Sequence, residues 1–361
     1  MAGNDFLLFI GAYTQSDGLG IGLAHFDADT GMLTTPELAA ELVNPSFVAL
    51  NPSLSHLYAV TEIDDYKSKF SGALSSFAVD RISGELTFLN RQPTNGPGPC
   101  FVTVDAKGQN AVVANYNGGS VAVLPINDDG SLEPLSDFVQ HEGAAGVVSD
   151  RQEGPHAHSA NLDLETSRVY VNDLGLDRIK SYDLDSSAGK LTPAGLDVEL
   201  HPGAGPRHFD FHPNGKYAYA INELDNTITT MDYERASGRL TVIQTVSALP
   251  EGWSGSSSCA DLHISPDGRF IYGSNRGHDS IVIYAIDPTT GRLEYVGHET
   301  TRGNNPRNFA IEPSGRYLLA ANQDTDNIIV FEVDNESGKL TATGTEVSVS
   351  MPVCLKLVPT A

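Results

Sequence analysis

The chain has 361 residues and carries 46 Asp and Glu against 22 Lys and Arg, a formal net charge of -24. This charge repels phosphate backbones and anionic membrane surfaces, so we expect neither nucleic acid nor a membrane as a partner. Closed all-β architectures reach this length around one core, and we expect residues 1–361 to form a single domain.

The first predicted element is a strand in the apolar run Phe6–Ile10. It follows Asp5 without a basic segment, and it is too short for the apolar part of a secretion signal. The three cysteines, Cys100, Cys259 and Cys354, have no metal-type spacing. We therefore expect a cytoplasmic protein whose cysteines bind no metal. We also expect it to use no metal or organic cofactor and to be a monomer or a weak homodimer.

One short motif, Gly-X-Leu, recurs along the whole chain. Successive glycines lie 46 to 59 residues apart, which is the period of a four-stranded propeller blade with loops of varying length. The glycine supplies the positive φ that a tight hairpin needs before the next strand. The seven copies begin at Gly31, Gly84, Gly130, Gly189, Gly238, Gly291 and Gly338.

A second turn precedes Gly-X-Leu in most copies. It combines Pro, a polar residue and Gly, as at 213–215, 266–268 and 313–315, and it joins two apolar runs. Each repeat therefore predicts strand A, a Pro-X-Gly turn, strand B, a loop, strand C, the Gly-X-Leu turn and strand D. Because no useful length of helical periodicity intervenes, the sequence predicts an all-β, seven-bladed β-propeller with four-stranded blades.

The two ends of the chain complement each other. The first repeat lacks a strand A, because residues 6–14 already have the pattern of strand B, whereas residues 354–358 form an isolated strand A. Pairing these segments would close the ring and leave no open sheet edge. We therefore expect the C-terminal strand to close the propeller.

Irregular loops mark one face of this predicted fold. In an up-and-down blade the start of strand A and the end of strand B share a face, and the two regular turns lie on the opposite one. Segments 63–72, 136–157 and 244–258 are irregular and fall on the first face. Variable loops on a rigid scaffold commonly carry function, so we expect the site there.

Aligning the repeats brings charged residues to this face. A purely structural ring favours small or apolar residues there, whereas this one holds one His, three Arg and three acids. The starts of strand A are Ser46, Cys100, His158, Arg207, Ala260, Arg307 and Val353. The ends of strand B are Glu62, Tyr116, Asp173, Glu223, Arg276 and Gln323.

These residue types suit hydrolysis of a lactone. The reaction needs a base for the attacking water, stabilisation of an oxyanion and a proton for the leaving ring oxygen. His and Glu transfer protons, and Arg forms charge-assisted bonds to a carboxylate, a phosphate or an oxyanion. The alternative is that Arg207 and Arg307 form structural ion pairs with Glu223 and its neighbours.

Five motifs follow one another along successive predicted blades: His158-Ser159-Ala160-Asn161, Gly205-Pro206-Arg207-His208, Asn222-Glu223-Leu224, Ser274-Asn275-Arg276 and Asn305-Pro306-Arg307. In this order they resemble the lactonase family of seven-bladed β-propellers, over essentially the whole chain. That family includes the bacterial propeller-type 6-phosphogluconolactonase and the fungal carboxymuconate-cyclising enzyme. The resemblance implies hydrolysis of an anionic sugar lactone, 6-phospho-D-glucono-1,5-lactone.

The resemblance also implies roles for individual residues. His158 and Glu223 are the expected proton-transfer groups, Arg207 and Arg276 the expected anion ligands, and the remaining residues are expected to line the substrate pocket. Those lining residues are Arg307, Gln323, His156, Asp173, Tyr116 and Glu62.

Two histidines compete for the catalytic position in strand A. His156 and His158 lie one residue apart and can face the same side of a strand, and we favour His158 because it occupies the position of Arg207 in the next repeat. His208 follows Arg207 and points to the opposite face if the strand is regular, so we expect it to pack in the core or to support a residue of the site from behind.

Three other interpretations use the same residues. A carboxymuconate lactone cycloisomerase needs similar Arg and acid-base groups, and a non-catalytic propeller binds a partner through this face. A calcium-dependent lactonase would use carboxylates such as Glu62, Asp173 and Glu223. Three arginines at the same mouth oppose a divalent cation, so we expect metal-independent hydrolysis.

Overall fold

The structure is a computed structural model that describes residues 5–15, 18, 20–67 and 69–361. Strands dominate this part of the chain, which contains one short 3-10 helix, η1 (Leu174–Leu176). The chain divides into two compact units, one of residues 1–18, 22–38 and 207–361 and the other of residues 19–21 and 39–206. The all-β prediction is confirmed, and the single domain over 1–361 stays a prediction.

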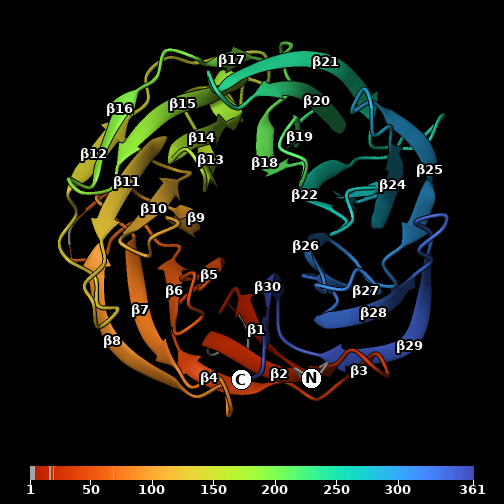
Figure 1. The fold of residues 1–361 in the computed structure, drawn as a ribbon, viewed down its shortest axis with the longest axis horizontal. Helices are drawn as coiled ribbons and strands as arrows, with labels where there is room; N and C mark the ends of the chain where they lie inside the picture. Colours follow the sequence, from red (N-terminus) through yellow and green to blue (C-terminus); the bar gives the residue numbers. More distant parts are fainter. Residues whose placement is uncertain (1–4, 16–17, 19, 68) are drawn as a thin grey trace. The chain divides into compact units, whose positions relative to one another are not determined.

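The first unit contains four sheets. In three of them the strands follow chain order, and in the remaining one the C-terminal strand pairs with the first strand of the chain (Figure 1). One sheet joins β30 (Pro352–Pro359), β1 (Asp5–Ala12), β2 (Gly20–Asp27) and β3 (Met32–Leu33), with β4 (Glu37–Glu41) paired to β2. The next contains β18 (Pro206–Phe211), β19 (Tyr217–Asn222), β20 (Thr227–Glu234) and β21 (Arg239–Ser247). The third contains β22 (Ser258–Ile264), β23 (Phe270–Arg276), β24 (Ser280–Ile286) and β25 (Leu293–Thr300). The fourth contains β26 (Pro306–Ile311), β27 (Tyr317–Asn322), β28 (Asn327–Val333) and β29 (Leu340–Ser348).

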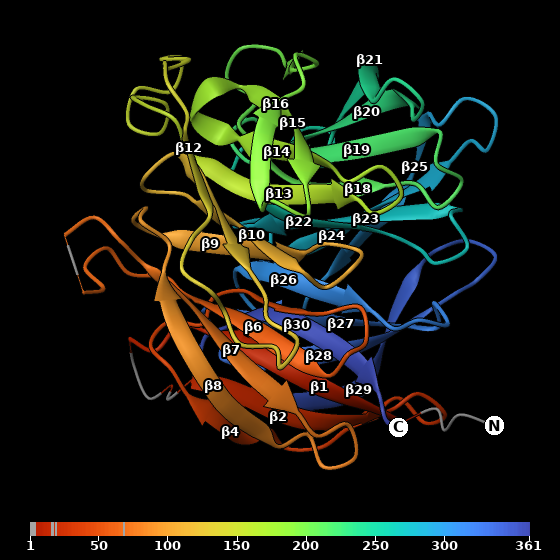
Figure 2. The same ribbon diagram turned by 60° about the vertical axis from the view of Figure 1, so that its left-hand side comes forward.

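The second unit contains three sheets of the same design. One contains β5 (Val48–Leu50), β6 (His56–Thr61), β7 (Ala73–Val79) and β8 (Leu86–Pro93). The next contains β9 (Pro99–Val104), β10 (Asn110–Asn115), β11 (Ser120–Pro125) and β12 (Asp137–Gln140). The last contains β13 (Ala157–Asp163), β14 (Arg168–Asp173), β15 (Arg178–Asp185) and β16 (Lys190–Pro193), with β17 (Val198–Glu199) paired to β15. Figure 2 shows β13, β14 and β15 side by side. The seven predicted repeats are thus seven sheets.

The predicted turns lie where the sequence places them. All seven Gly-X-Leu glycines have positive φ, between 58° at Gly189 and 83° at Gly130. Two of the predicted irregular loops are shorter than expected. Residues 137–140 of segment 136–157 form β12, because they pair with β11, and β21 continues to Ser247 within segment 244–258.

Some Gly-X-Leu glycines also accept a hydrogen bond from a tyrosine of the preceding sheet. Tyr219 donates to the Gly291 carbonyl at 2.8 Å, and Tyr272 donates to the Gly338 carbonyl at 3.0 Å. A Cβ at Gly338 would lie 2.4 Å from the Phe270 ring. The glycine therefore serves the turn and also the close packing of one sheet on the next.

The predicted pairing of the chain ends is confirmed. β1 pairs antiparallel with β30, from Phe6 opposite Pro359 to Gly11 opposite Cys354. The C-terminal strand therefore acts as strand A of the first sheet, whose strand B is β1. Figure 1 shows the two strands next to each other.

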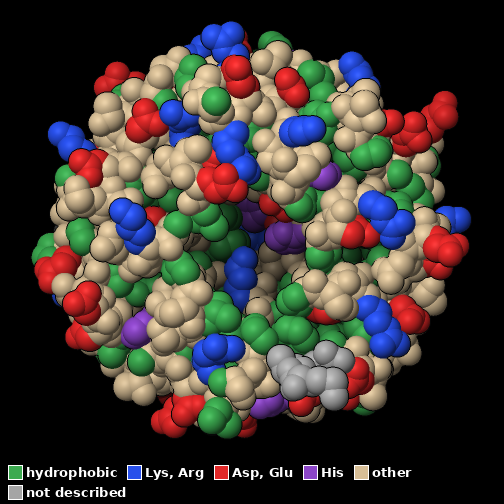
Figure 3. All heavy atoms as spheres, in the orientation of Figure 1, with side chains coloured by type: hydrophobic (Ala, Val, Ile, Leu, Met, Phe, Trp, Pro, Cys, Tyr) green, Lys and Arg blue, Asp and Glu red, His purple; other side chains and the backbone are tan. Residues whose placement is uncertain are grey.

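The hydrophobic core lies between adjacent sheets. Strands B are buried along their whole length, as in β10, β19 and β27, because a sheet covers each of their faces. In the first unit, Phe26 and Leu8 pack with Tyr317 and Leu319 of the neighbouring sheet. Outside the core, Asp and Glu side chains are dispersed over the face drawn in Figure 3.

Candidate active site

The residues aligned from the repeats lie at corresponding strand ends. The second residues of β9, β13, β18, β26 and β30 are Cys100, His158, Arg207, Arg307 and Val353. Asp173 and Arg276 end β14 and β23, while Glu62, Tyr116, Glu223 and Gln323 directly follow β6, β10, β19 and β27. The repeat alignment thus placed these side chains at the ends of their strands, whereas Ser46 precedes β5 and Ala260 is the third residue of β22.

A β-bulge occurs at this position in several strands A. His158 has no partner of its own between the pairs Ala157–Asp173 and Ser159–Asn172. Arg307 is bulged in the same way in β26, and Cys100 and Val353 are bulged in β9 and β30. A bulge breaks the alternation of side chains and re-aims the extra residue.

In the first unit, two arginines converge on one carboxylate. Glu223 Oε2 lies 3.0 Å from Arg207 Nε and 3.0 Å from Arg276 Nη2. The side chains of Arg207 and Glu223 are 2% and 4% exposed, and that of Arg276 is 14% exposed. Two guanidinium groups on one oxygen favour the ionised form of this carboxylate.

Arg307 adds a third positive charge to this cluster. Burial, together with the charges of Arg307 and Arg276, lowers the pKa of Arg207 to about 10. The Arg307 guanidinium also lies over the Tyr13 ring, 5.4 Å from its centroid, in a cation–π contact. The charges of three arginines therefore act on one another here, an arrangement that attracts anions. Gln323, the fifth predicted site residue in this unit, donates to Asp324 at 3.1 Å.

His208 and Asp261 lie next to the arginine cluster, and the sequence did not indicate that they form a pair. His208 accepts from Arg207 at 3.2 Å and contacts Asp261 at 2.6 Å, so it does not simply point away from Arg207. Burial and the charge of Arg207 lower the pKa of His208 to about 4. Asp261 lies 53 residues away in the next sheet, and no local pattern in the sequence indicates the pair.

In the second unit, His158 lies in a buried aromatic environment. Its ring packs edge-on against Tyr116, with centroids 5.4 Å apart, and the Cys100 thiol donates to its carbonyl at 3.2 Å. His156 stacks on the same Tyr116 ring at 4.6 Å and pairs with Glu153 at 3.2 Å. Both predicted histidines therefore contact Tyr116.

Arg151 joins this group from the predicted loop. It donates to the Tyr116 hydroxyl at 2.9 Å. The irregular segment 136–157 indicated the region, but nothing in the sequence singled out this residue. Arg151 is thus a further cation beside the two histidines.

Asp173 is held by protein donors on both oxygens. Oδ2 lies 2.6 Å from His141 Nδ1, and Oδ1 accepts from the amides of His156 at 2.8 Å and Leu176 at 3.1 Å. Tyr182 donates to the other nitrogen of His141 at 3.0 Å. Asp173 was predicted to bind substrate, but its carboxylate is fully buried and supports the segment that leads into His158.

Glu62 has a partner from its own sheet. The Ser46 hydroxyl donates to Glu62 Oε2, which joins the start of strand A to the end of strand B. The start of strand A and the end of strand B are therefore in contact in this sheet, as the repeat alignment predicted.

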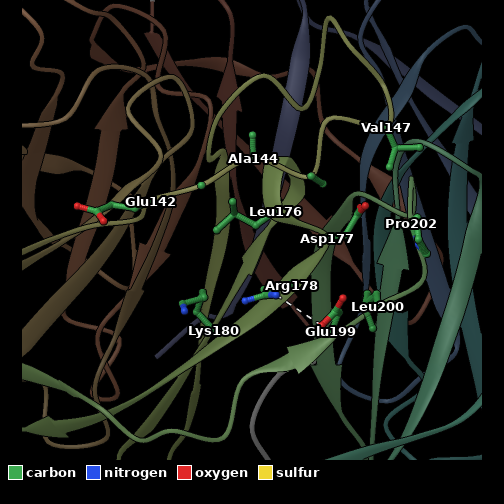
Figure 4. A pocket seen from close by; sticks show the side chains of 12 residues that line it. Glu142, Ala144, Val147, Leu176, Asp177, Arg178, Lys180, Glu199, Leu200 and Pro202 are labelled. Carbon is green, nitrogen blue, oxygen red and sulfur yellow. Dashed lines mark hydrogen bonds and ion pairs between the residues drawn. The ribbon is translucent and has the colours of Figure 1, made fainter.

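A pocket of about 410 Å³ lies elsewhere in the second unit (Figure 4). It lies between the segment after β12 and strands β15 and β17, and its lining includes Arg178, Lys180 and Glu199. Arg178 pairs with Glu199 at 3.5 Å, so opposite charges are combined there. Its lining contains none of the residues predicted from the repeats.

No helix in the described part of the chain has the length and apolar composition of a membrane span. Within the same residues, no group of three His, Cys, Asp or Glu side chains is arranged to hold a metal ion.

The family model described as "Lactonase, 7-bladed beta-propeller" matches residues 7–357. The chain belongs to this lactonase family. The predicted family and the seven four-stranded blades are thereby confirmed, and the chain is an enzyme that hydrolyses a lactone.

Relatives in this lactonase family cover nearly the whole chain. A Bacillus subtilis (strain 168) protein named 6-phosphogluconolactonase is 39% identical over 351 residues, which are 97% of this chain and 98% of the relative. A protein of the same name from Formosa agariphila is 36% identical over 84% of this chain and 86% of its own length. The structure of a Pseudomonas aeruginosa periplasmic gluconolactonase has a TM-score of 0.93 and 34% identity, covering 99% of this chain and 100% of that one.

Proposed function

We propose that the chain hydrolyses 6-phospho-D-glucono-1,5-lactone to 6-phosphogluconate. The observation that carries this proposal is the group of three arginines: Arg207 and Arg276 both contact Glu223, and the charge of Arg307 acts on Arg207. On a chain of net charge -24, this local positive charge is suited to an anionic substrate. Two relatives named 6-phosphogluconolactonase support the choice of a phosphorylated sugar lactone.

The proposed reaction opens the lactone ring with water. Glu223, ionised between two guanidinium groups, accepts a proton as water attacks the carbonyl carbon. Arg207 stabilises the oxyanion of the tetrahedral intermediate. The bond from this carbon to the ring oxygen then breaks, and the leaving oxygen takes up a proton. The family resemblance is the reason for proposing His158 as the donor of this proton. The products are a carboxylate and a hydroxyl group on one open chain.

We propose that the hydrolysis needs no metal ion. The arginines supply the positive charge that a divalent cation would otherwise give the oxyanion. The test is hydrolysis after exhaustive treatment with EDTA. An unchanged rate supports the proposal, whereas a loss that calcium restores contradicts it.

We also propose the cytoplasm as the compartment. Cys100, Cys259 and Cys354 are buried thiols that form no disulfide, as a reducing compartment favours. Because the Pseudomonas aeruginosa structure is that of a periplasmic protein, cell fractionation of the native host is the necessary test.

The activity is tested by titrating the acid released from freshly prepared lactones. The proposal predicts hydrolysis of 6-phosphogluconolactone and a higher KM for unphosphorylated gluconolactone, which lacks the charge that the arginines bind. A carboxymuconate lactone is the third substrate, because cycloisomerisation would use the same groups. Failure on every sugar lactone contradicts the proposed function.

A further inference from the structure

The guanidinium group of Arg207 is fixed by three protein groups. Its Nε donates to Glu223 at 3.0 Å, and its Nη1 donates to the Ala260 carbonyl at 2.6 Å. Nη1 also lies 3.2 Å from His208 Nε2. None of these three contacts involves Nη2. By holding Nε and Nη1, they fix the direction in which Nη2 points.

The contact with Arg207 fixes the tautomer of His208. A guanidinium group only donates hydrogen bonds, so His208 Nε2 must accept, and the ring proton must be on Nδ1. Nδ1 donates this proton to Asp261 Oδ1 at 2.6 Å. The lowered pKa of His208, about 4, keeps the ring in this neutral form.

Asp261 is in turn held by donors from three strands. Its oxygens accept from the Leu262 amide at 3.0 Å, from His263 at 3.0 Å, and from the Asn308 side chain. Burial opposes its ionisation, but the charge of His263 and the hydrogen bonds from both histidines hold the pKa of Asp261 well below its ordinary value. The carboxylate is thus a fixed and buried anchor.

A bulge in β22 explains how two consecutive residues of this strand contact both Arg207 and His208. Ala260 and Asp261 together oppose Ser274, since Cys259 pairs with Asn275 and Leu262 with Gly273. The Ala260 carbonyl consequently reaches Arg207, while the next side chain reaches His208. Strands β18, β22 and β26 all contribute to this arrangement through His208, Asp261 and Asn308.

We propose that His208 and Asp261 are positioning residues for the lactonase reaction, which orient Arg207 toward the oxyanion of the tetrahedral intermediate. This inference rests on the proposed function of Arg207 as an anion ligand. His208 acts only through Arg207, and Asp261 acts only through His208. The pair fixes the orientation of the guanidinium group. This orientation affects the rate, since misplacing a reacting group by about 1 Å can cost about 100-fold.

The test compares two buried histidines of the same unit. His208→Leu removes both hydrogen bonds, and His208→Gln keeps an amide that donates to Asp261 and accepts from Arg207. His212 is also buried and bonded, to the Gly268 carbonyl at 2.8 Å and the Asn214 amide at 3.1 Å, but these partners lie in turns. His212→Leu therefore measures the effect of losing a structural histidine.

We expect His208→Leu to lower kcat by about 10- to 100-fold, with recovery of most of the rate in His208→Gln. His212→Leu should lower the melting temperature and leave kcat within about twofold of the wild type. A wild-type kcat in His208→Leu, or an equal loss of kcat in His212→Leu, overturns the inference.

Crystal structures of the wild type and His208→Leu give a second readout that does not depend on activity. The guanidinium of Arg207 should leave its present position between Glu223 and Ala260 in the variant. An unmoved guanidinium overturns the positioning role. If the wild type hydrolyses no lactone, the proposed function fails, and the two structures still decide whether His208 positions Arg207.

Discussion

Glu223 Oε2 accepts a hydrogen bond from Arg207 Nε at 3.0 Å and contacts Arg276 Nη2 at the same distance. Replacing Glu223 by Gln keeps the shape of the side chain but removes the charge and the proton acceptor. We expect kcat for 6-phosphogluconolactone to fall by about 100- to 10,000-fold, as for loss of a general base. Initial rates of acid release give the measurement.

Glu234→Gln is the matched control for this variant. Glu234 lies in the same sheet, at the end of β20, and is exposed to solvent. Its substitution should leave kcat unchanged. A Glu223→Gln enzyme that also keeps the wild-type rate would remove Glu223 from the catalytic assignment.

His158→Ala tests the proposed proton donor. We expect kcat to fall by about 100-fold or more, because the leaving ring oxygen would no longer receive its proton from the protein. His156→Ala tests the alternate histidine and should cost less. The exposed His25 provides a control, since His25→Ala should behave as the wild type. A larger loss in His156→Ala than in His158→Ala would exchange the two assignments.

The sequence predicts the repeat and the strand ends because their signals are local. Pro-X-Gly and Gly-X-Leu turns require particular backbone angles at single positions, and Gly338 indeed has φ of 71°. Counting from these turns was sufficient to place Arg207 and His158 in their strands. The position of each residue along its own sheet could therefore be predicted from the sequence.

The contacts between side chains of different sheets could not be predicted from such local signals. Asp173 meets His141 across 32 residues, and His208 meets Asp261 across 53. Such partners come together only after sheets have packed, and a bulge changes where a side chain points without changing the sequence pattern. The sequence consequently assigned Asp173 to the substrate, whereas the structure shows its carboxylate occupied by protein donors.

Removing residues 354–361 tests the closing strand. The deletion takes away the partners of β1 from Gly11 through Phe6 and exposes an unpaired, apolar edge. We expect a lower soluble yield and a broad thermal transition, measured by centrifugation and calorimetry. Deleting Ala361 alone should change neither property. A soluble truncation that melts cooperatively would contradict the closing role of β30.

Gly338→Ala tests the packing of the Gly-X-Leu turn. The backbone has φ of 71°, and the new Cβ would meet the Phe270 ring at 2.4 Å, so strain and crowding act together. We expect the free energy of unfolding to fall by about 2 to 5 kcal/mol in chemical denaturation. Gly297→Ala is the control, because open space surrounds that position. Equal stability of the two variants would show that the turn tolerates a side chain.

The neutral form of His208 predicts a loss of stability in acid. Its pKa is about 4 in the folded chain and 6.5 ordinarily, so between these values the unfolded chain binds a proton that the folded chain does not. Stability therefore falls as the pH decreases through this window. From about pH 7 to about pH 5 the contribution of His208 is about 2 kcal/mol.

The groups around His208 titrate differently. His263 has a raised pKa, so in this window it is protonated in both states, and Arg207 stays charged. Asp261 titrates below the window, since its pKa is well below its ordinary value. Asp210 has a raised pKa and acts in the opposite direction, because its folded form binds a proton first.

His208→Gln isolates the contribution of His208 because the amide does not titrate. Urea denaturation of both proteins at about pH 7 and about pH 5 should show that the wild type loses about 2 kcal/mol more than the variant. Asp210, Asp261 and His263 remain in both proteins, so their effects largely cancel in this comparison. An equal loss in the two proteins would mean that His208 takes up its proton as readily in the folded chain as in the unfolded one.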